Sequence, residues 1–418
     1  MKDSNRSREV DVVVIGAGQA GLSAAYHLRR LGFEPYHGFV VLDSGAGPGG
    51  AWRERARSLT MRKVHGIFDL PGARREARPA DAVRPAADVV AEYYADYEHR
   101  FELPVRRPVD VRAVRYSEDS RLVVETDDGA WASRAVVNAT GTWTHPYWPY
   151  YPGVAEFGGR QLHSADYRGP AEFSGQRVVV VGGGHSATHI LSEVADVAAS
   201  TTWLTRRPPV FEGVEFTEDF GRQVIAAVDA RVRAGLPPQS VVSVTGLGHT
   251  PVVQEALAKG VLNRLPIFDR IEAGGVRWND GTFVAADVII WATGFRAALA
   301  HLAPLGLREP GGGIRMDGTR VASEPRLHLV GYGPSASTVG ANRAGRAAAL
   351  EIRDLLSVDA SPAATSIPSS WIRERVGPLR RHGGIEVGQI PLETSSGRDR
   401  PTPDANRVHP VGSRVPRG

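Results

Sequence analysis

The sequence predicts an α/β fold with two parallel sheets, each begun by a buried strand, a glycine turn and a helix. The first unit, VDVVVIGAGQAGLSAAYHLRRLG, opens with a β-branched run that is typical of a strand buried on both faces of a parallel sheet. A second unit, QRVVVVGGGHSATHILSEVA, repeats this order later in the chain. Each unit continues into a further apolar strand, FVVLD after the first and TTWLT after the second.

The elements that follow each unit also repeat. RLVVETDDGAWASRAVVNATG is predicted to form a hairpin with DDG as its turn, followed by a strand that ends in ATG. GVRWNDGTFVAADVIIWATGF has the same order, with NDG as the turn. We therefore expect each ATG to mark a crossing between domains, through TWTHPYWPYYPG on the way out and after Gly294 on the way back.

This organisation predicts two Rossmann-like dinucleotide-binding domains, each with three layers (ββα), and the second is inserted into the first. Residues 1–148 and 296–356 are expected to form the first domain, and residues 149–295 the second. Residues 357–418 are rich in Pro, Ser and Arg, lack apolar periodicity and are predicted to form a loosely ordered tail.

Composition limits the functions that are open to the chain. Its 418 residues are enough for two or three domains, and its net charge of +4 is small and scattered, which argues against nucleic acid as a partner. The absence of Cys excludes a disulfide framework, Cys-ligated metals and dithiol redox chemistry, and no metal site is expected. The polar start and the lack of a long apolar run predict a cytoplasmic protein that does not enter a membrane. The oligomeric state stays open, and a homodimer is compatible with the sequence.

The first glycine turn predicts a dinucleotide site. Gly16, Gly18 and Gly21 follow a strand and open a helix, and Asp43 follows at the interval expected for an acid that accepts hydrogen bonds from a ribose 2′-hydroxyl. Gly16 permits the tight turn, Gly18 lets a pyrophosphate approach the backbone, and Gly21 allows close packing of helix and strand. A purely structural turn is the alternative.

The second glycine turn keeps Gly182 and Gly184, but its unit ends differently. Arg206 and Arg207 stand where the first unit has its acid. Guanidinium groups bind a 2′-phosphate that a carboxylate would repel, so the second nucleotide is predicted to be NADPH. Two solvated arginines at the end of a surface strand are the alternative.

The first nucleotide is predicted to be FAD, because a chain that binds both a hydride donor and an acceptor can pass the hydride between them. The segment GPGGAWRER places Trp52 and Arg53 beside this nucleotide, although a Trp here could instead pack in the core. Near the other end of the chain, Gly331 and a helix that begins near Ser337 are expected to present N–H groups to the electron-accepting ring.

Together these motifs resemble the class B flavin-containing monooxygenases. GAGQAG, GGAW, F-x-G-x-x-x-H-x-x-x-Y, GGGHSA and ATGF occur in the family's order within residues 10–356. The most specific is the fingerprint Phe157, Gly159, His163 and Tyr167, which in the family lies where the FAD and NADPH domains meet. There its histidine is thought to couple domain movement to reduction and oxygenation. TTWLTRRPP, HLAPLGL and PRLHLVGYG are most similar to the small flavin monooxygenases of arsenic-resistance operons.

The resemblance implies an FAD- and NADPH-dependent monooxygenase that acts on a small-molecule substrate and O2 through a flavin C4a-hydroperoxide. Because the Baeyer–Villiger branch usually has Trp where this chain has Tyr167, we expect oxygen transfer to nitrogen, sulfur or arsenic. The alternatives are Baeyer–Villiger oxidation, a reductase or oxidase that passes electrons to a partner or to O2, and a nucleotide sensor without catalysis. The implied catalytic residues are His163, Tyr167 and His65, and the implied cofactor-binding residues are Gly16, Gly18, Gln19, Gly21, Asp43, Gly50, Trp52, Arg53, Val111, Thr140, Gly182, Gly184, Ser186, Arg206, Arg207, Thr293 and Gly331.

The chain departs from the family pattern in places. SLTMRKVHGIFDLPG is basic, with Arg62, Lys63 and His65, which indicates either an anionic substrate or a solvated loop. His185 stands where relatives often have Asn, and Tyr332–Ser335 where they often have Asp, so the ribityl contact stays open. For the fingerprint His and Tyr, the structural alternative is a buried hydrogen-bonded pair under a loop.

Overall fold

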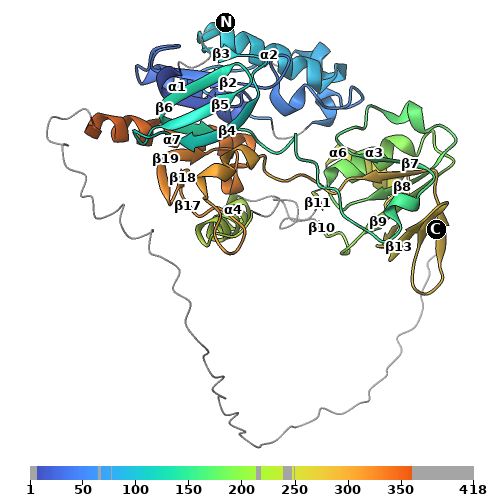
Figure 1. The fold of residues 1–418 in the computed structure, drawn as a ribbon. Coiled ribbons are helices and arrows are strands. Elements are labelled where there is room, and N and C mark those ends of the chain that lie inside the picture. The colour runs from blue at the N-terminus through green and yellow to red at the C-terminus, as the bar shows by residue number, and fades with distance from the viewer. Residues whose placement is uncertain are drawn as a thin grey trace, which may run out of the picture. The chain divides into compact units, whose positions relative to one another are not determined.

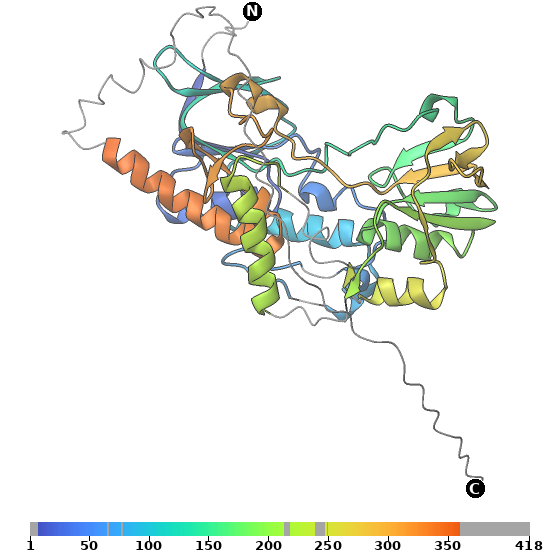
Figure 2. The ribbon, with the colours of Figure 1, turned by 90° about the horizontal axis from the view of Figure 1, so that it is seen from below.

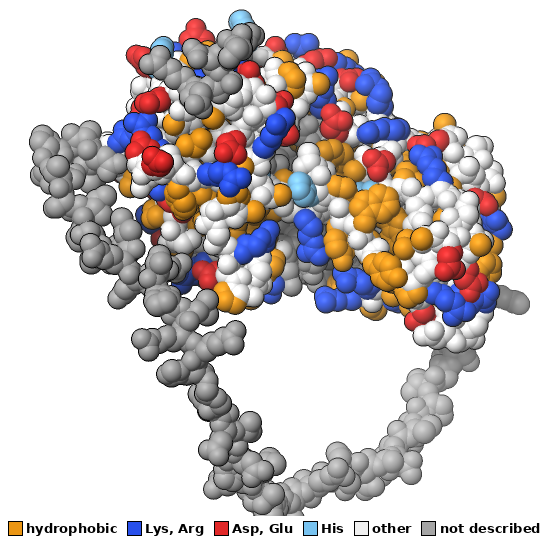
Figure 3. All heavy atoms as spheres, in the orientation of Figure 1, with side chains coloured by type: hydrophobic (Ala, Val, Ile, Leu, Met, Phe, Trp, Pro, Cys, Tyr) orange, Lys and Arg blue, Asp and Glu red, His pale blue; other side chains and the backbone are white. Residues whose placement is uncertain are grey.

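The computed structural model describes residues 7–64, 67–76, 78–212, 218–238, 247–248 and 250–359. Their strands and helices form two main sheets with helices packed on them (Figure 1). Lys and Arg side chains are interspersed with Asp and Glu over the face in Figure 3, as the small net charge suggests. None of the described helices is both long and apolar enough to span a bilayer. Most of the predicted tail, residues 360–418, lies outside the described residues.

The first sheet has nine strands in the order β17-β18-β19-β6-β1-β2-β3, and β5 pairs with both β6 and β4. The path from β19 to β3 is parallel, so the carboxyl ends of these strands meet at one edge. The strands are β1 (Arg8–Ile15), β2 (Phe39–Leu42), β3 (Val105–Arg106), β4 (Val111–Tyr116), β5 (Leu122–Thr126), β6 (Gly129–Asn138), β17 (Met316–Asp317), β18 (Arg320–Val321) and β19 (Glu324–Leu329).

Alternate side chains of the central strand β1 point into two different cores. Val12 and Val14 pack with helices α1 (Gln19–Arg30), α2 (Ala86–Arg100) and α7 (Thr338–Asp359) on one face. Val13 and Ile15 pack on the other face with residues of β4, β5 and the segment that precedes β17. Helices thus cover one face of the sheet and strands the other, as expected for a three-layer ββα domain.

The second sheet has five strands, all parallel, in the order β12-β9-β8-β16-β7. Helices α3 and α6 cover one face, and the antiparallel sheet β13-β14-β15 covers the other. This repeats the three layers and confirms the predicted fold class. Its elements are β7 (Arg160–His163), β8 (Arg177–Val181), α3 (His185–Val194), β9 (Ser200–Thr205), α6 (Pro251–Ala258), β12 (Arg264–Pro266), β13 (Arg270–Glu272), β14 (Gly275–Arg277), β15 (Phe283–Ala285) and β16 (Val288–Trp291), with β10 (Phe211–Glu212) and β11 (Leu247–Gly248) forming a separate pair.

The two crossings between the sheets run side by side. The chain leaves the first sheet after β6 and returns to it after β16, at the two ATG sequences. The N–H of Tyr147 donates to the carbonyl of Gly294 (2.9 Å), and the N–H of Ala298 donates to the carbonyl of Gly141 (2.9 Å). Each crossing therefore braces the other through backbone hydrogen bonds.

Helix α4 (Glu218–Arg233) was not anticipated. It belongs to the inserted stretch of sequence, yet its Val232 is fully buried in the core on the strand-covered face of the first sheet. The helix lies against β17 and the turn at Gly333–Ser335 (Figure 2). The inserted segment thus contributes a helix to the packing of the first sheet as well as building the second.

Candidate active site

A cavity of about 1000 Å3 opens at the carboxyl ends of β1, β2 and β6, where ligands bind in open α/β sheets. Ten of the sequence-predicted cofactor residues lie in its wall, although they come from distant parts of the chain. They are Gly16, Gly18, Gln19, Asp43, Gly50, Trp52, Arg53, Val111, Thr140 and Gly331.

The glycine turn between β1 and α1 is packed too tightly for side chains. A Cβ on Gly21 would lie 1.9 Å from the carbonyl oxygen of Gly16, and Gly16 itself has φ +97°. Gly18 is different, because a Cβ there would meet nothing within 4 Å. Gly21 therefore holds the helix against the turn from behind the cavity wall, whereas Gly18 leaves backbone open toward the cavity.

Asp43 is held in place by an arginine that the sequence did not single out. Its Oδ2 accepts from Nε of Arg107 (2.6 Å), and its Oδ1 accepts from the N–H of Ala17 (3.2 Å). Arg107 in turn makes a two-pronged ion pair with Glu98 at 2.7 and 2.6 Å. The acid at the end of β2 is therefore preorganised by the glycine turn and by α2.

Gln19 joins three helices at the cavity. Its Nε2 donates to Oδ1 of Asn342 on α7 (2.8 Å), and its Oε1 accepts from the hydroxyl of Tyr94 on α2 (2.7 Å). Thr140, at the first crossing, donates its hydroxyl to the carbonyl of Ala298 on the return crossing (2.7 Å). Both predicted cofactor residues thus have structural partners in this region.

Arg55 is a part-buried cation in the cavity wall that sequence reasoning missed. Its guanidinium lies 4.3 Å from the ring centre of Trp143 and 5.7 Å from that of Trp52. Its Nε is buried and has no hydrogen-bond partner among the described residues. Burial lowers the pKa of Arg55 from 12.5 to about 10, so the group stays charged at neutral pH. Trp143 also stacks on Phe295 of the return crossing (5.0 Å), which connects the cavity wall to both crossings.

His163 of the fingerprint is fully buried at the end of β7 and contacts the return crossing. Its Nδ1 accepts from the N–H of Ala165 (3.1 Å), so its Nε2 carries the proton and donates to the carbonyl of Gly294 (3.1 Å). Its ring packs edge-on against Phe295 (5.0 Å). Burial lowers the pKa of His163, which keeps the imidazole neutral.

Tyr167 of the fingerprint has a different partner. Its buried hydroxyl donates to Oε2 of Glu193 on α3 (2.9 Å), and its ring stacks on Phe173. Burial and the neighbouring carboxylate raise the pKa of Tyr167 far above its ordinary value, so it stays protonated. His163 and Tyr167 hydrogen-bond to different groups, the backbone of Ala165 and Gly294 for the first and Glu193 for the second. Both fingerprint side chains are thus buried and hydrogen-bonded, as in the structural alternative, although not to each other, so their catalytic role stays a prediction.

The residues predicted for the second nucleotide lie away from this cavity. Gly182 and Gly184 precede α3, and the N–H of Gly182 donates to the carbonyl of Leu204 on β9 (2.9 Å). Arg206 and Arg207 follow β9 at the same edge, and both are exposed. Ser186 lies in the first turn of α3, while the hydroxyl of Thr293 donates to the carbonyl of Tyr147 and so belongs to the paired crossings.

The three basic residues of the segment SLTMRKVHGIFDLPG differ in their surroundings. His65 lies outside the described residues. Arg62 is exposed, whereas Nζ of Lys63 is 2.8 Å from Oε1 of Glu193 in a part-buried ion pair. The charge of Lys63 is therefore compensated within the protein. Lys63 is therefore part of an internal ion pair, whereas the exposed Arg62 fits a solvated loop, and the choice between that and an anionic substrate stays open for the segment.

The lowered pKa values of two histidines predict that the folded protein loses stability in mild acid. His301 lines the cavity with Nε2 2.7 Å from Oδ1 of Asn138, and burial lowers its pKa to about 4. Burial also lowers the pKa of His328, in the core, to about 3. In the unfolded chain both bind a proton below about pH 6.5, so the free energy of unfolding should fall as the pH drops from about 6.5 toward 4. Melting temperatures between about pH 7.5 and 5 test this, and His301→Gln should flatten the decline. A constant melting temperature over this range would contradict it.

Comparison with known proteins agrees with this architecture. The model of the family described as pyridine nucleotide-disulphide oxidoreductase matches residues 13–241. A solved flavin-containing monooxygenase from Stenotrophomonas maltophilia is 39% identical with a TM-score of 0.71, and the match covers 83% of this chain and 99% of that one. The flavin-containing monooxygenase FMO GS-OX-like 2 of Arabidopsis thaliana is 30% identical over 47% of this chain and 49% of its own length. A Baeyer–Villiger monooxygenase of Streptomyces coelicolor is 31% identical over 48% of this chain and 38% of its own length.

Two parallel-sheet domains, each with its own glycine turn, define an oxidoreductase of the two-dinucleotide-domain class. The chain belongs to the pyridine nucleotide-disulphide oxidoreductase family and to the flavin-containing monooxygenases, which confirms the resemblance seen in the sequence. The chain has no Cys, the residue on which the disulphide chemistry in the first family's description depends. The narrower likeness to enzymes of arsenic-resistance operons stays a prediction.

Proposed function

We propose that the chain is an FAD- and NADPH-dependent monooxygenase that transfers one oxygen atom from O2 to a soft nucleophilic nitrogen, sulfur or arsenic atom of a small molecule. The observation that carries the proposal is the cavity at the carboxyl edge of the first sheet, whose wall includes both crossings between the sheets. In this assignment residues 1–148 and 296–356 bind FAD, and residues 149–295 bind NADPH.

The residues of the cavity fit FAD. Gly18 offers open backbone at the N-terminus of α1 for a pyrophosphate, and Asp43 is a fixed acceptor at the end of β2 for a ribose. When bound, reduced FAD supplies the electrons and the oxygen activation. The chain binds and orients the cofactor, and Arg55 places a positive charge beside it, next to the rings of Trp143 and Trp52.

The edge of the second sheet fits NADPH. The N-terminus of α3 follows Gly184, where a Cβ would meet nothing within 4 Å, so backbone N–H groups are accessible to a pyrophosphate. Arg206 and Arg207 are exposed at the same edge, and no described carboxylate forms an ion pair with either. Two exposed guanidinium groups at this edge favour a 2′-phosphate over a free 2′-hydroxyl.

The choice of a heteroatom substrate rests on Tyr167. Its hydroxyl uses a buried carboxylate as acceptor, so this position is built for a Tyr rather than for the Trp of the Baeyer–Villiger branch. The test offers the purified protein NADPH and O2 with amines, thioethers, arsenite and cyclic ketones. N-, S- or As-oxides support the proposal. Esters or lactones alone would assign it to Baeyer–Villiger oxidation, and peroxide alone to an oxidase.

His163→Ala is expected to keep FAD but to release more peroxide for each NADPH consumed. The imidazole joins the end of β7 to Gly294 and packs on Phe295, a residue of the cavity wall, so its loss frees the return crossing beside the cavity. A small misplacement of reacting groups can lower a reaction rate by about hundredfold. Peroxide and product are measured against NADPH oxidation with the best substrate of the panel. Unchanged coupling would reduce His163 to a packing residue.

A further inference from the structure

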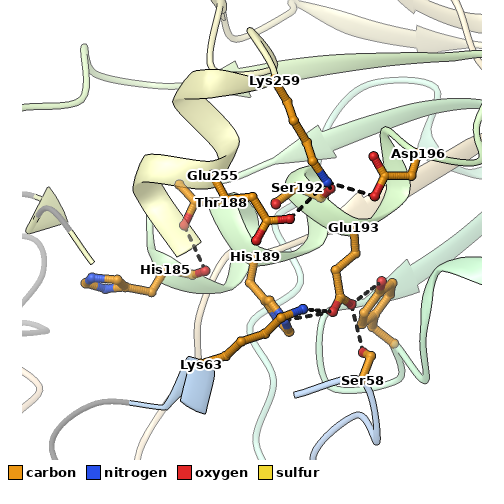
Figure 4. Close-up of polar contacts among 11 residues, drawn as sticks. Ser58, Lys63, His185, Thr188, His189, Ser192, Glu193, Asp196, Glu255 and Lys259 are labelled. Carbon is orange, nitrogen blue, oxygen red and sulfur yellow. Dashed lines mark hydrogen bonds and ion pairs between the residues drawn. The ribbon is translucent and has the colours of Figure 1, made fainter. Parts of the chain in front are cut away.

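Four side chains converge on the carboxylate of Glu193, at the C-terminal end of α3 (Figure 4). Its Oε2 accepts from the hydroxyls of Ser58 (2.7 Å) and Tyr167 (2.9 Å). Its Oε1 is 2.8 Å from Nζ of Lys63 and 3.1 Å from Nε2 of His189. The donors belong to three separate segments, and the side chain of Glu193 is only 7% exposed.

The carboxylate of Glu193 is ionised in the folded chain. Burial alone would raise the pKa of Glu193, but the hydrogen bonds from His189, Lys63 and Ser58 lower it far below its ordinary value. Each carboxylate oxygen has two partners, so the buried charge is fully satisfied. Removing one partner from such a buried group leaves a poorly compensated charge, which is strongly unfavourable.

The cluster connects the two proposed cofactor sites. Ser58 and Lys63 lie on the stretch that continues from Arg55 in the cavity wall. Glu193 lies on α3, whose other end begins at the second glycine turn. Tyr167 belongs to the fingerprint, in the segment that follows β7, so a single carboxylate joins the first domain, the fingerprint and the helix proposed to bind NADPH.

We propose that Glu193 and Lys63 are positioning residues, which hold α3 and the fingerprint in register with the first domain so that NADPH delivers its hydride to the flavin. This inference rests on the proposed function. Neither residue is assigned a contact with a cofactor or a substrate. Their effect is on the relative placement of the two nucleotide-binding elements, and hydride transfer depends steeply on such placement.

Lys259, which follows α6 and contacts the C-terminal end of α3, offers a matched control (Figure 4). Nζ of Lys259 donates to the carbonyl of Ser192 (2.7 Å) and pairs with Asp196 (2.7 Å) and Glu255 (2.9 Å). Its side chain is 26% exposed, close to the 21% of Lys63. All of these partners lie within the second domain, so Lys259→Met removes a lysine of similar burial without touching the contact between domains.

The experiment compares Lys63→Met, Lys63→Arg and Lys259→Met in the full flavin-loaded protein. Amide hydrogen exchange without NADPH or substrate should rise in Lys63→Met at residues 53–64 and 160–168, and should rise in Lys259→Met only near α6. Anaerobic flavin reduction at saturating NADPH should slow by roughly tenfold to hundredfold in Lys63→Met. It should recover in Lys63→Arg and stay near wild type in Lys259→Met, while dithionite should reduce all variants alike.

Equal slowing by Lys63→Met and Lys259→Met, or unchanged exchange at residues 160–168 in Lys63→Met, would overturn the inference. If Lys63→Met does not fold, Ser58→Ala removes a neutral donor from the same carboxylate. It should raise exchange in the same two ranges, and wild-type exchange there would equally overturn the inference. Failure of wild-type protein to accept hydride from NADPH would instead contradict the proposed function, because the exchange measurement needs no nucleotide.

Discussion

Gly21→Ala is expected to purify with little or no FAD and with a melting temperature several degrees below that of the wild type. The new Cβ would lie 1.9 Å from the carbonyl oxygen of Gly16 and 3.3 Å from Cβ of Ala139, and the closer atom is backbone that cannot rotate away. Helix α1 must therefore move off the turn. Overpacking of this kind costs about 1–3 kcal/mol and occasionally more, which corresponds to a fall of several degrees in melting temperature. The same movement disperses the N–H groups that would face the pyrophosphate.

Gly18→Ala separates the two effects. Its Cβ would meet no protein atom within 4 Å, so apo-protein stability should match the wild type while FAD binds more weakly. Flavin content is measured from the absorbance of the purified protein, and melting temperatures are compared after the flavin is removed. A Gly21→Ala protein that is fully yellow and melts like the wild type would show that this turn is not the tight cradle described above.

Arg206→Ala combined with Arg207→Ala is expected to weaken NADPH binding strongly and NADH binding little. Each hydrogen-bonded charge pair with a phosphate is worth about 1.5–3 kcal/mol, which corresponds to roughly tenfold to 150-fold in affinity for each arginine that contacts it. NADH lacks the 2′-phosphate, so its affinity should change little. The two dissociation constants are measured by titration of the oxidised flavoprotein with NADP+ and NAD+ as well as from reduction kinetics.

Arg177→Ala is the control for this change. Arg177 is an exposed arginine at the start of β8, at the opposite edge of the second sheet, where it pairs with Asp287 (2.6 Å). Its loss should leave the preference between the two nucleotides unaltered. If the double variant lost the same factor of affinity for both nucleotides, neither arginine would read the 2′-phosphate.

The layers of the fold could be predicted because local sequence determines them. Continuous β-branched runs form the central strands β1 and β8. The glycine turn after each strand leads directly into a helix, as the sequence pattern predicts. The return of α4 to the first sheet had no such signal. It depends on Val232 packing into the core on the strand-covered face, beside β17 and the turn at Gly333–Ser335, which only tertiary packing brings together.

The candidate site, too, could be predicted only in part. The glycines and Asp43 follow strands at fixed intervals, so their meeting at one edge follows from topology. Arg107 and Glu193 carry no motif, and their importance comes from partners that are distant in sequence. Lys63 was noticed for its charge, but only the folded chain shows that a buried carboxylate neutralises it. The roles of these charged residues depend on contacts with residues distant in sequence, which the sequence alone does not show.

Oxygen-18 labelling tests the central claim most directly. The purified protein is supplied with NADPH, 18O2 and the best substrate of the amine, thioether and arsenite panel, and product, peroxide and NADPH are quantified together. The proposed function predicts one 18O atom in each product molecule, with product formation close to equal to NADPH consumed. Peroxide equal to the NADPH consumed, with no 18O in any product, would contradict the monooxygenase assignment.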